Sequence, residues 1–291
     1  MAIRRSSGWL SPRRITATTG PGITRNLQKI RIIMKPLIQF IGLALASAIG
    51  AASLHAQIPT NAPPPVKPKA VWKSSVAAGL TLTSGNSETT LGTLTADTAG
   101  KWDHSELGIG ANGAYGESKA PGQAQSTRTA EMLHGYTQYN WLFTERLYGY
   151  GRVEGLHDGV ADIKYRVSIG PGAGYYFIKT TNTDLSAEAG PGYVFEKLGN
   201  ESSSYASLRV GEKFHQALSD RARLWQTAEL LPQVDDLNNY VVNAELGIEA
   251  DLTRDKKLAL RSYITDTYNN VPAPGRKKND LAWITAIAYK F

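Results

Sequence analysis

Twelve stretches of alternating side chains restrict the fold of this chain more than any other feature. In the last stretch, apolar residues such as Leu281, Trp283 and Ile287 occupy every second position up to Phe291. A period of two is the spacing of a β-strand with one apolar face, and we find no long stretch with a helical period. The sequence therefore predicts an all-β fold. The stretches are about 73–84, 89–101, 104–117, 127–143, 147–157, 163–179, 183–196, 203–217, 221–233, 240–252, 257–268 and 280–291.

The connections between these stretches alternate in length. Those at 144–146, 219–220 and 254–256 are tight, whereas other connections are longer. An even number of strands with short turns at one end and longer loops at the other is typical of single-chain outer-membrane barrels. We therefore predict an antiparallel up-and-down transmembrane β-barrel of about 12 strands. The longer connections are 118–126, 197–202, 234–239 and 269–279.

The predicted hairpin 163–196 offers a local test of strand pairing. Gly170-Pro171-Gly172 and Gly190-Pro191-Gly192 lie symmetrically about Thr181. A turn centred there pairs Phe177 with Leu185, Val167 with Phe195 and Arg166 with Glu196. Because proline cannot donate to a β-ladder, we expect the strands to bend or bulge where the two prolines face each other.

The alternation also assigns charged residues to one face of each strand. A soluble β-sandwich shows the same period, so alternation alone does not decide which face is inside. The length and number of the strands favour a barrel in lipid, where a charge facing the bilayer centre costs about 2–4 kcal/mol. Charged faces must then line the interior. The predicted lumen-lining residues are Arg152, Glu154, Lys164, Arg166, Glu188, Glu196, Arg209, Lys213, Glu245, Glu249 and Arg261.

Interior charges of both signs have two interpretations. The favoured one is a paired network that fills and rigidifies the lumen. The other is a polar pore whose charges select solutes. Aromatic residues beside the tight turns predict an interfacial girdle. The predicted girdle residues are Trp102, Trp141, Phe143, Tyr148, Tyr175, Phe177 and Phe291.

The N-terminal region predicts export. Residues 34–56 have a basic start, a short apolar core and a small residue at the expected cleavage point, which is typical of a signal peptide. We predict that 1–33 is a non-native extension from an upstream start, that 57–71 is a proline-rich periplasmic linker, and that 72–291 is the barrel. Residues 1–56 hold eight basic residues and no acidic one, which leaves 24 basic and 25 acidic residues in the mature part. The net charge of −1 argues against a nucleic-acid partner.

Residues that could support catalysis or metal binding are few. The chain has no cysteine, and no His, Asp or Glu spacing suggests a metal or cofactor site. His157-Asp158 could form the pair of a surface hydrolase, but turn chemistry explains it more simply. Arg276-Lys277-Lys278 could contact lipopolysaccharide phosphates, and a solvated basic loop is the simpler account.

The C-terminal end resembles the assembly signal of bacterial outer-membrane barrels, carried here by Trp283, Ile287, Tyr289 and Phe291. The region 72–291 also resembles a family of uncharacterised outer-membrane proteins of the salt-induced type. The resemblance implies a barrel in the outer membrane, contact with its lipids and lipopolysaccharide, and insertion by the barrel assembly machinery. It implies no catalytic residues. The segments that carry it are Gly79–Asn86, Tyr165–Phe177, Ala187–Tyr193, Tyr268–Pro272, Lys277–Asp280 and Ala288–Phe291.

These features together predict a non-enzymatic barrel of the Gram-negative outer membrane, exported through a cleaved signal peptide. It would be either a narrow polar pore or a structural, stress-related barrel. An outer-membrane hydrolase and a soluble periplasmic β-rich binding module are the alternatives. The sequence does not specify the oligomeric state.

Overall fold

The structure, a computed structural model, describes residues 71–83, 88–120 and 123–291. The predicted extension, signal peptide and most of the linker lie outside these residues. Within the described ranges, no helix is long and apolar enough to cross a membrane. The described elements are strands β1 (Val71–Thr83), β2 (Glu88–Lys101), β3 (Ser105–Lys119), β4 (Thr127–Leu142), β5 (Leu147–Asp158), β6 (Ile163–Lys179), β7 (Thr183–Leu198), β8 (Glu201–Ala217), β9 (Ala222–Pro232), β10 (Tyr240–Asp251), β11 (Leu258–Asn269) and β12 (Asn279–Lys290).

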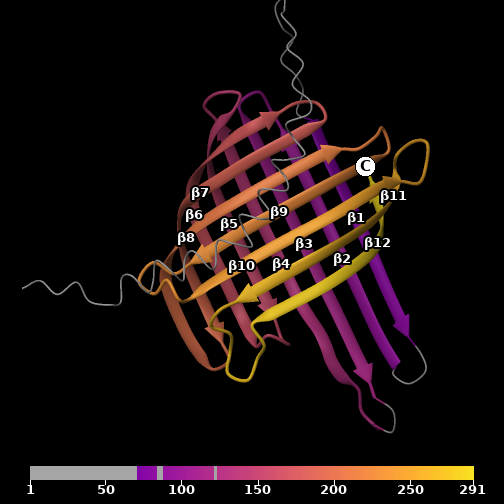
Figure 1. The fold of residues 1–291 in the computed structure, drawn as a ribbon, viewed down its shortest axis with the longest axis vertical. Coiled ribbons are helices and arrows are strands. Elements are labelled where there is room, and N and C mark those ends of the chain that lie inside the picture. The colour runs from indigo at the N-terminus through magenta and orange to yellow at the C-terminus, as the bar shows by residue number, and fades with distance from the viewer. Residues whose placement is uncertain (1–70, 84–87, 121–122) are drawn as a thin grey trace, which may run out of the picture. The chain divides into compact units, whose positions relative to one another are not determined.

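The twelve strands form one closed antiparallel barrel in which each strand pairs with its sequence neighbours (Figure 1). The ring closes where β1 pairs with β12, and the backbone of Ser74 exchanges two hydrogen bonds with Phe291. The predicted all-β, twelve-stranded up-and-down barrel is therefore confirmed. We call the end that holds residues 102–104, 143–146, 180–182, 218–221 and 252–257 the turn end, and the opposite end the loop end.

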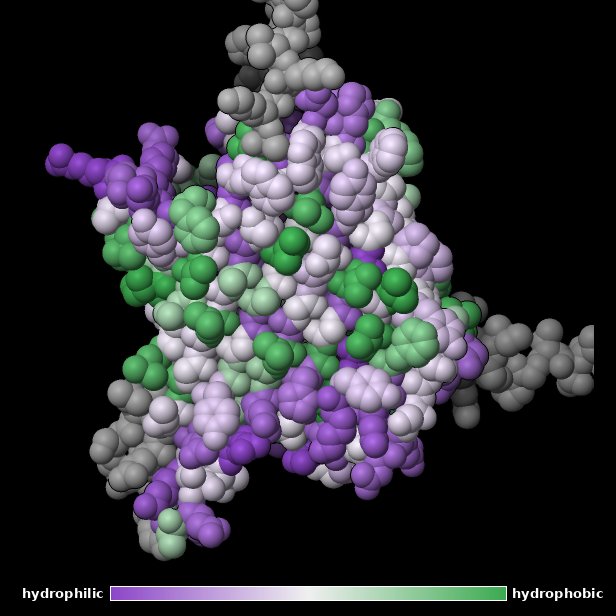
Figure 2. Space-filling model, turned by 180° about the vertical axis from the view of Figure 1, so that it is seen from behind, coloured by the Kyte–Doolittle hydropathy of each residue, from purple (hydrophilic) through white to green (hydrophobic). Residues whose placement is uncertain are grey.

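Large apolar side chains point outward from the barrel wall. Leu133, Val153, Ile169, Leu208 and Ile248 are all exposed although they lie in the middle parts of their strands. In Figure 2, hydrophobic side chains gather across the middle of the visible wall, and hydrophilic ones dominate its lower end. This distribution is the reverse of a soluble sandwich, whose apolar face is the packed one.

The β6–β7 hairpin follows the predicted register over most of its length. Val167 pairs with Phe195 and Arg166 with Glu196. The predicted pairing of Phe177 with Leu185 is wrong, because a bulge between Tyr176 and Ile178 brings Ile178 opposite Leu185. A bulge adds one unpaired residue to one strand and so shifts the register beyond it.

The two Gly-Pro-Gly segments interrupt the β6–β7 ladder. No register pair joins 170–172 to 190–192, although Ile169–Tyr193 and Ala173–Ala189 are paired on either side. A Cβ at Gly170 would lie 2.3 Å from the carbonyl oxygen of Pro191, so the two backbones approach more closely than any side chain would allow. The expected irregularity at the facing prolines is thus present.

Two sequence expectations need correction. The connection predicted as a longer loop at 197–202 is a two-residue turn, because Gly199 adopts a φ of 60° that a tight hairpin turn requires. Tyr148, predicted as a girdle residue, points into the barrel and is 1% exposed. The other predicted girdle residues are exposed on the outer wall.

Candidate functional site: the charged lumen

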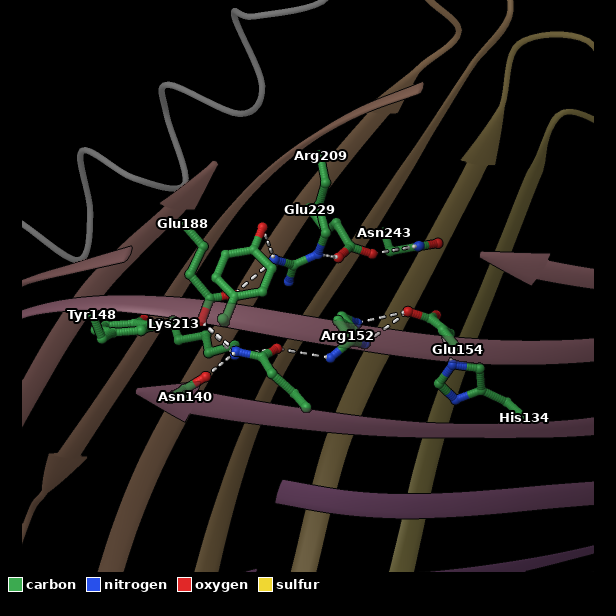
Figure 3. Close-up of polar contacts among 12 residues, drawn as sticks. His134, Asn140, Tyr148, Arg152, Glu154, Glu188, Arg209, Lys213, Glu229 and Asn243 are labelled. Carbon is green, nitrogen blue, oxygen red and sulfur yellow. Dashed lines mark hydrogen bonds and ion pairs between the residues drawn. The ribbon is translucent and has the colours of Figure 1, made fainter. Parts of the chain in front are cut away.

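The barrel interior concentrates the ionisable side chains of the middle strands (Figure 3). Alternation puts each of them on the face opposite the apolar outer wall. Glu188 of β7 is the centre of the largest group. One of its carboxylate oxygens accepts hydrogen bonds from Gln138 (2.8 Å), Tyr148 (2.9 Å) and Lys213 (3.0 Å), and the other accepts one from Arg209 (2.7 Å). The residue is only 3% exposed, and four donors with two cations offset the cost of removing its charge from water.

Contacts within this group cross the lumen. Lys213 Nζ of β8 lies 3.3 Å from Gln138 Oε1 of β4, and the Tyr176 hydroxyl of β6 donates to Glu106 of β3 at 2.7 Å. A round barrel of twelve strands, about 4.8 Å apart and tilted about 40°, would separate β4 from β8 by roughly 20 Å. A lysine and a glutamine cannot bridge that distance, so the barrel wall is flattened along this line. The Lys213–Gln138 contact thus crosses the narrowed lumen, and we call this contact the bar.

Arg152 links the bar to a second carboxylate. Its guanidinium donates twice to Glu154, at 2.9 and 2.8 Å, and once to Gln138 at 3.2 Å. The other Glu154 oxygen contacts His134 Nε2 at 2.7 Å. The Arg152 guanidinium also lies over the Tyr136 ring at 4.4 Å, which adds a cation–π contact.

Arg209 joins the network to the far wall. It donates to Glu229 of β9, to Glu188, and to the Tyr150 hydroxyl at 3.2 Å. Glu229 in turn accepts a hydrogen bond from Asn243 of β10 at 3.4 Å. These side chains of β4, β5, β7, β8, β9 and β10 therefore form one connected set of hydrogen bonds and ion pairs.

Aromatic rings in the lumen lie against glycines of neighbouring strands. A Cβ at Gly172 would lie 2.3 Å from the Tyr150 ring, and a Cβ at Gly174 would lie 2.2 Å from the Tyr148 ring. The glycines thus let large rings lie along the wall and leave the charged side chains room to cross the lumen. The same arrangement pairs Tyr136 with Gly110 and Trp225 with Gly247.

A second group surrounds Glu249, near the turn end. Arg223 and Arg261 donate to its two carboxylate oxygens, and Lys290 donates to it at 2.9 Å. Lys290 also forms an ion pair with Asp251. Glu249 is 3% exposed, and its three cations neutralise it where water is excluded.

Arg261 also spans the closure of the barrel. It is on β11, yet its guanidinium donates to Ser75 of β1 at 2.8 Å and to Asp97 of β2 at 3.4 Å. Together with Glu249 of β10, these contacts join strands on both sides of the β1–β12 seam. The side chain therefore ties the first strands of the chain to the last.

The structure places the remaining predicted lumen residues as follows. Arg166 and Glu196 face each other at 2.7 Å, and Glu245 accepts a hydrogen bond from Trp225 Nε1 at 2.5 Å. Lys164 lies at a β6 irregularity near the loop end, pairs with Asp162 at 3.0 Å, and does not join the networks described above.

Several charged lumen residues were missed in the sequence. The same alternation could have identified them: Lys290, for example, lies between two outward-facing aromatic residues of the last strand. What the pattern could not supply is which residues meet across the lumen. The missed residues include Asp97, Glu106, Arg223, Glu229, Asp251 and Lys290.

The predicted His157-Asp158 pair forms the last two residues of β5, and the turn at 159–162 follows it. Asp158 Oδ1 accepts the backbone N–H groups of Val160 and Ala161, and His157 Nδ1 contacts the carbonyl of Lys164 at 2.9 Å. These contacts match the turn interpretation. Across the described ranges, no group of three or more His, Asp or Glu side chains could hold a metal ion.

The comparisons with known proteins identify a family. Residues 76–291 match the model of a protein family of unknown function, DUF481. No curated protein matches the chain.

Three similar solved structures are distant in sequence. The NanC porin is 6% identical, with coverage of 75% of this chain and 100% of that one and a TM-score of 0.46. The COG4313 outer-membrane channel from Pseudomonas putida F1 is 11% identical, with coverage of 81% and 100% and a TM-score of 0.44. The translocator domain of the autotransporter NalP from Neisseria meningitidis is 15% identical, with coverage of 76% and 87% and a TM-score of 0.40. The fold assignment rests on the strand pairing rather than on these similarities. Because the family match spans almost the whole barrel, the chain belongs to the DUF481 family.

Proposed function

We propose that this protein is a non-enzymatic barrel of the bacterial outer membrane that passes small polar solutes through a narrow charged lumen. The observation that carries the proposal is the connected interior network, above all the Lys213–Gln138 bar between β8 and β4. An apolar outer wall fits lipid, and an interior of paired charges fits hydrated solutes better than apolar ones. Its turn end would face the periplasm, since the N-terminal side of β1 and the C-terminus both lie there.

The proposed location makes outer-membrane lipids and lipopolysaccharide the surroundings of the barrel, and the barrel assembly machinery its insertion partner. The exposed outer face of Trp283, Ile287, Tyr289 and Phe291 supports this proposal. Membrane fractionation followed by gels of unheated and boiled samples tests it. A compact, faster band in the outer-membrane fraction supports a barrel there, whereas a soluble protein without a band shift contradicts it.

Single-channel conductance in planar bilayers tests the pore. We expect the wild-type barrel to conduct weakly and Lys213→Ala to conduct more, because the substitution removes one side of the bar while Arg209 still neutralises Glu188. Lys257→Ala is the matched control, since Lys257 is exposed in a turn. If neither the wild type nor Lys213→Ala conducts, the network is a structural filling and the pore proposal is wrong.

A second candidate function, a structural or stress-related barrel, is favoured by the dense pairing around Glu188 and Glu249. It predicts full outer-membrane assembly with no conductance, and a loss of envelope integrity in high salt when the protein is absent. The salt-induced designation stays a prediction that this growth test addresses. The hydrolase alternative requires a lipid- or peptide-cleaving activity that His157→Ala abolishes.

A further inference from the structure

The seam between β1 and β12 is the least paired interface of the barrel. Ser75–Ala78 pair with Ile287–Lys290, a register of four residue pairs, and the Ser74–Phe291 backbone hydrogen bonds extend it by one position. Every other neighbouring pair shares eight or more, β8–β9 being the next shortest. Figure 1 shows indigo β1 and yellow β12 meeting near the C-terminus and running apart toward the loop end.

Both strands continue beyond the paired part. β1 stays paired with β2 up to Thr83, and β12 is paired with β11 from Asn279 onward. Toward the loop end, the two strands therefore face each other with unpaired backbone edges, which are 79–83 of β1 and 279–286 of β12. Open edges are not stable against lipid tails, and they persist only where they border water or protein. We call this unpaired part of the seam the gap, and its edges must border water, either that of the lumen or that outside the loop end.

The two walls of this gap differ in chemistry. On the outer side, Leu80, Leu281 and Trp283 are 68%, 70% and 75% exposed, and Leu281 and Trp283 are among the most exposed apolar residues of the described chain. On the inner side, Ala282, Ile284 and Ala286 alternate with them, and Ala286 is buried. The gap thus lies between an outer surface that suits hydrocarbon and the charged side chains of the lumen.

The gap is limited to the loop end. Gly79 lies where the strands begin to part, and a Cβ there would lie 2.8 Å from the Thr285 carbonyl oxygen. Below it, Arg261 ties β11 to Ser75 and Asp97 across the seam. The seam at the turn end is therefore held by side chains as well as by backbone pairing. Only the part of the seam near the proposed outer leaflet lacks strand pairing.

We propose that this gap is a lateral portal for amphiphiles, through which a molecule with a charged head and a single apolar chain passes between the lumen and the outer leaflet. The head would occupy the hydrated lumen while the chain extends between β1 and β12 into lipid. A zwitterionic head suits an interior in which charges of both signs are paired. The portal rests on the proposed membrane-spanning barrel, but it does not require ion conductance.

A removable lock across the seam tests the portal. Continuing the observed register places Leu80 opposite Thr285, so Leu80→Cys with Thr285→Cys would form a disulfide only if the strands close. The chain has no native cysteine to interfere. The matched control is Val76→Cys with Tyr289→Cys, which lies in the paired part of the seam and faces outward. Both variants are first checked for the compact band on unheated gels.

The probe is a dodecyl lysophosphatidylcholine that carries a diazirine beside its head group. We expect photolabelling of inward-facing Ile284 and Tyr263 in wild-type proteoliposomes, at least a tenfold loss after oxidation of the Leu80–Thr285 cysteine pair, and recovery after reduction. Oxidation of the control pair should leave labelling unchanged. If the portal pair does not oxidise while the control pair does, the two strands remain apart at Leu80 and Thr285. Labelling of Ile284 and Tyr263 in the unlocked protein then decides whether the portal exists.

Two results would overturn the portal: labelling of the inward residues that the lock does not reduce, or no labelling of them in the unlocked barrel. Ion conductance of the same variants separates this from the pore proposal. A barrel that is labelled in a lock-dependent way but never conducts refutes the polar pore and keeps the portal. A barrel that conducts but is never labelled refutes the portal and keeps the polar pore.

Discussion

At the scale of single residues, the lumen depends on carboxylates that are buried but fully engaged. Glu188 accepts from four side chains, two of which are cations. Removing such a charge is costly because its partners stay behind in a place with little water. The stability of the lumen therefore depends on all the partners of each carboxylate together rather than on any one ion pair.

Glu188→Gln should lower the free energy of unfolding by roughly 2–4 kcal/mol, because Arg209 and Lys213 lose their shared anion. Urea unfolding of the detergent-refolded barrel, followed by tryptophan fluorescence, measures the change. Glu201→Gln, at the exposed end of β8, is the control and should stay within about 0.5 kcal/mol of the wild type. Equal stability of Glu188→Gln and the control would show that the lumen is too wet for the pairing to matter.

Gly172→Ala should destabilise the barrel by about 1–3 kcal/mol, because the added methyl group would meet the Tyr150 ring at 2.3 Å. Gly151→Ala is the matched control on the outer wall, where a Cβ meets nothing within 4 Å. The same urea titration compares the two. A neutral Gly172→Ala would mean that Tyr150 can move away from the wall without loss.

The lumen composition could be predicted from the sequence, because alternation fixes the face of each side chain once the apolar face is assigned to lipid. Partners could not be predicted where they lie on distant strands. The Lys213–Gln138 contact depends on the flattening of the barrel, and no local pattern encodes that distance. Tyr148 was misplaced in the girdle although alternation puts it on the same face as Arg152 and Glu154, where its ring covers Gly174.

At the scale of the elements, the strands were predictable and their irregularities were not. Period two identifies a strand, but a bulge changes neither composition nor period enough to be noticed. This is why the shift at Tyr176–Ile178 and the short turn at Gly199 escaped the prediction. The Gly-Pro-Gly segments are the exception, since proline cannot donate a backbone hydrogen bond and so predicts a break in the β-ladder.

Arg261→Ala should weaken the closure of the barrel. It removes the hydrogen bonds to Ser75 and Asp97, each worth about 1–3 kcal/mol for a charged donor, while Lys290 and Arg223 still neutralise Glu249. We expect the compact gel band to convert to the unfolded band several degrees below the wild-type temperature. Arg276→Ala, in the 270–278 loop, is the control. Identical conversion temperatures would show that backbone pairing alone holds the seam at the turn end.

At the scale of the whole molecule, the C-terminal residue has two roles in our account. Its ring is exposed on the outer wall near the turn end, and its backbone closes the ring of strands on Ser74. Deletion of Phe291 should therefore reduce the amount of compact barrel in the outer-membrane fraction, as measured on unheated gels. Phe143→Ala, another exposed aromatic residue near the same end, should assemble at close to the wild-type level. Equal accumulation of both variants would remove Phe291 from the proposed assembly signal.

The closure on Ser74 also sets an order for folding. Eleven of the twelve strand interfaces join neighbours in sequence, so each can form as a hairpin with a short loop. The remaining interface joins residues more than two hundred positions apart through four register pairs and the Ser74–Phe291 backbone hydrogen bonds. Contacts between distant parts of a chain form slowly because the entropy of closing a long loop is lost before they stabilise anything. We therefore expect ring closure to be the last and slowest event, so that a chain stalled before it would be a curved sheet of eleven hairpin contacts whose first and last strands have yet to meet.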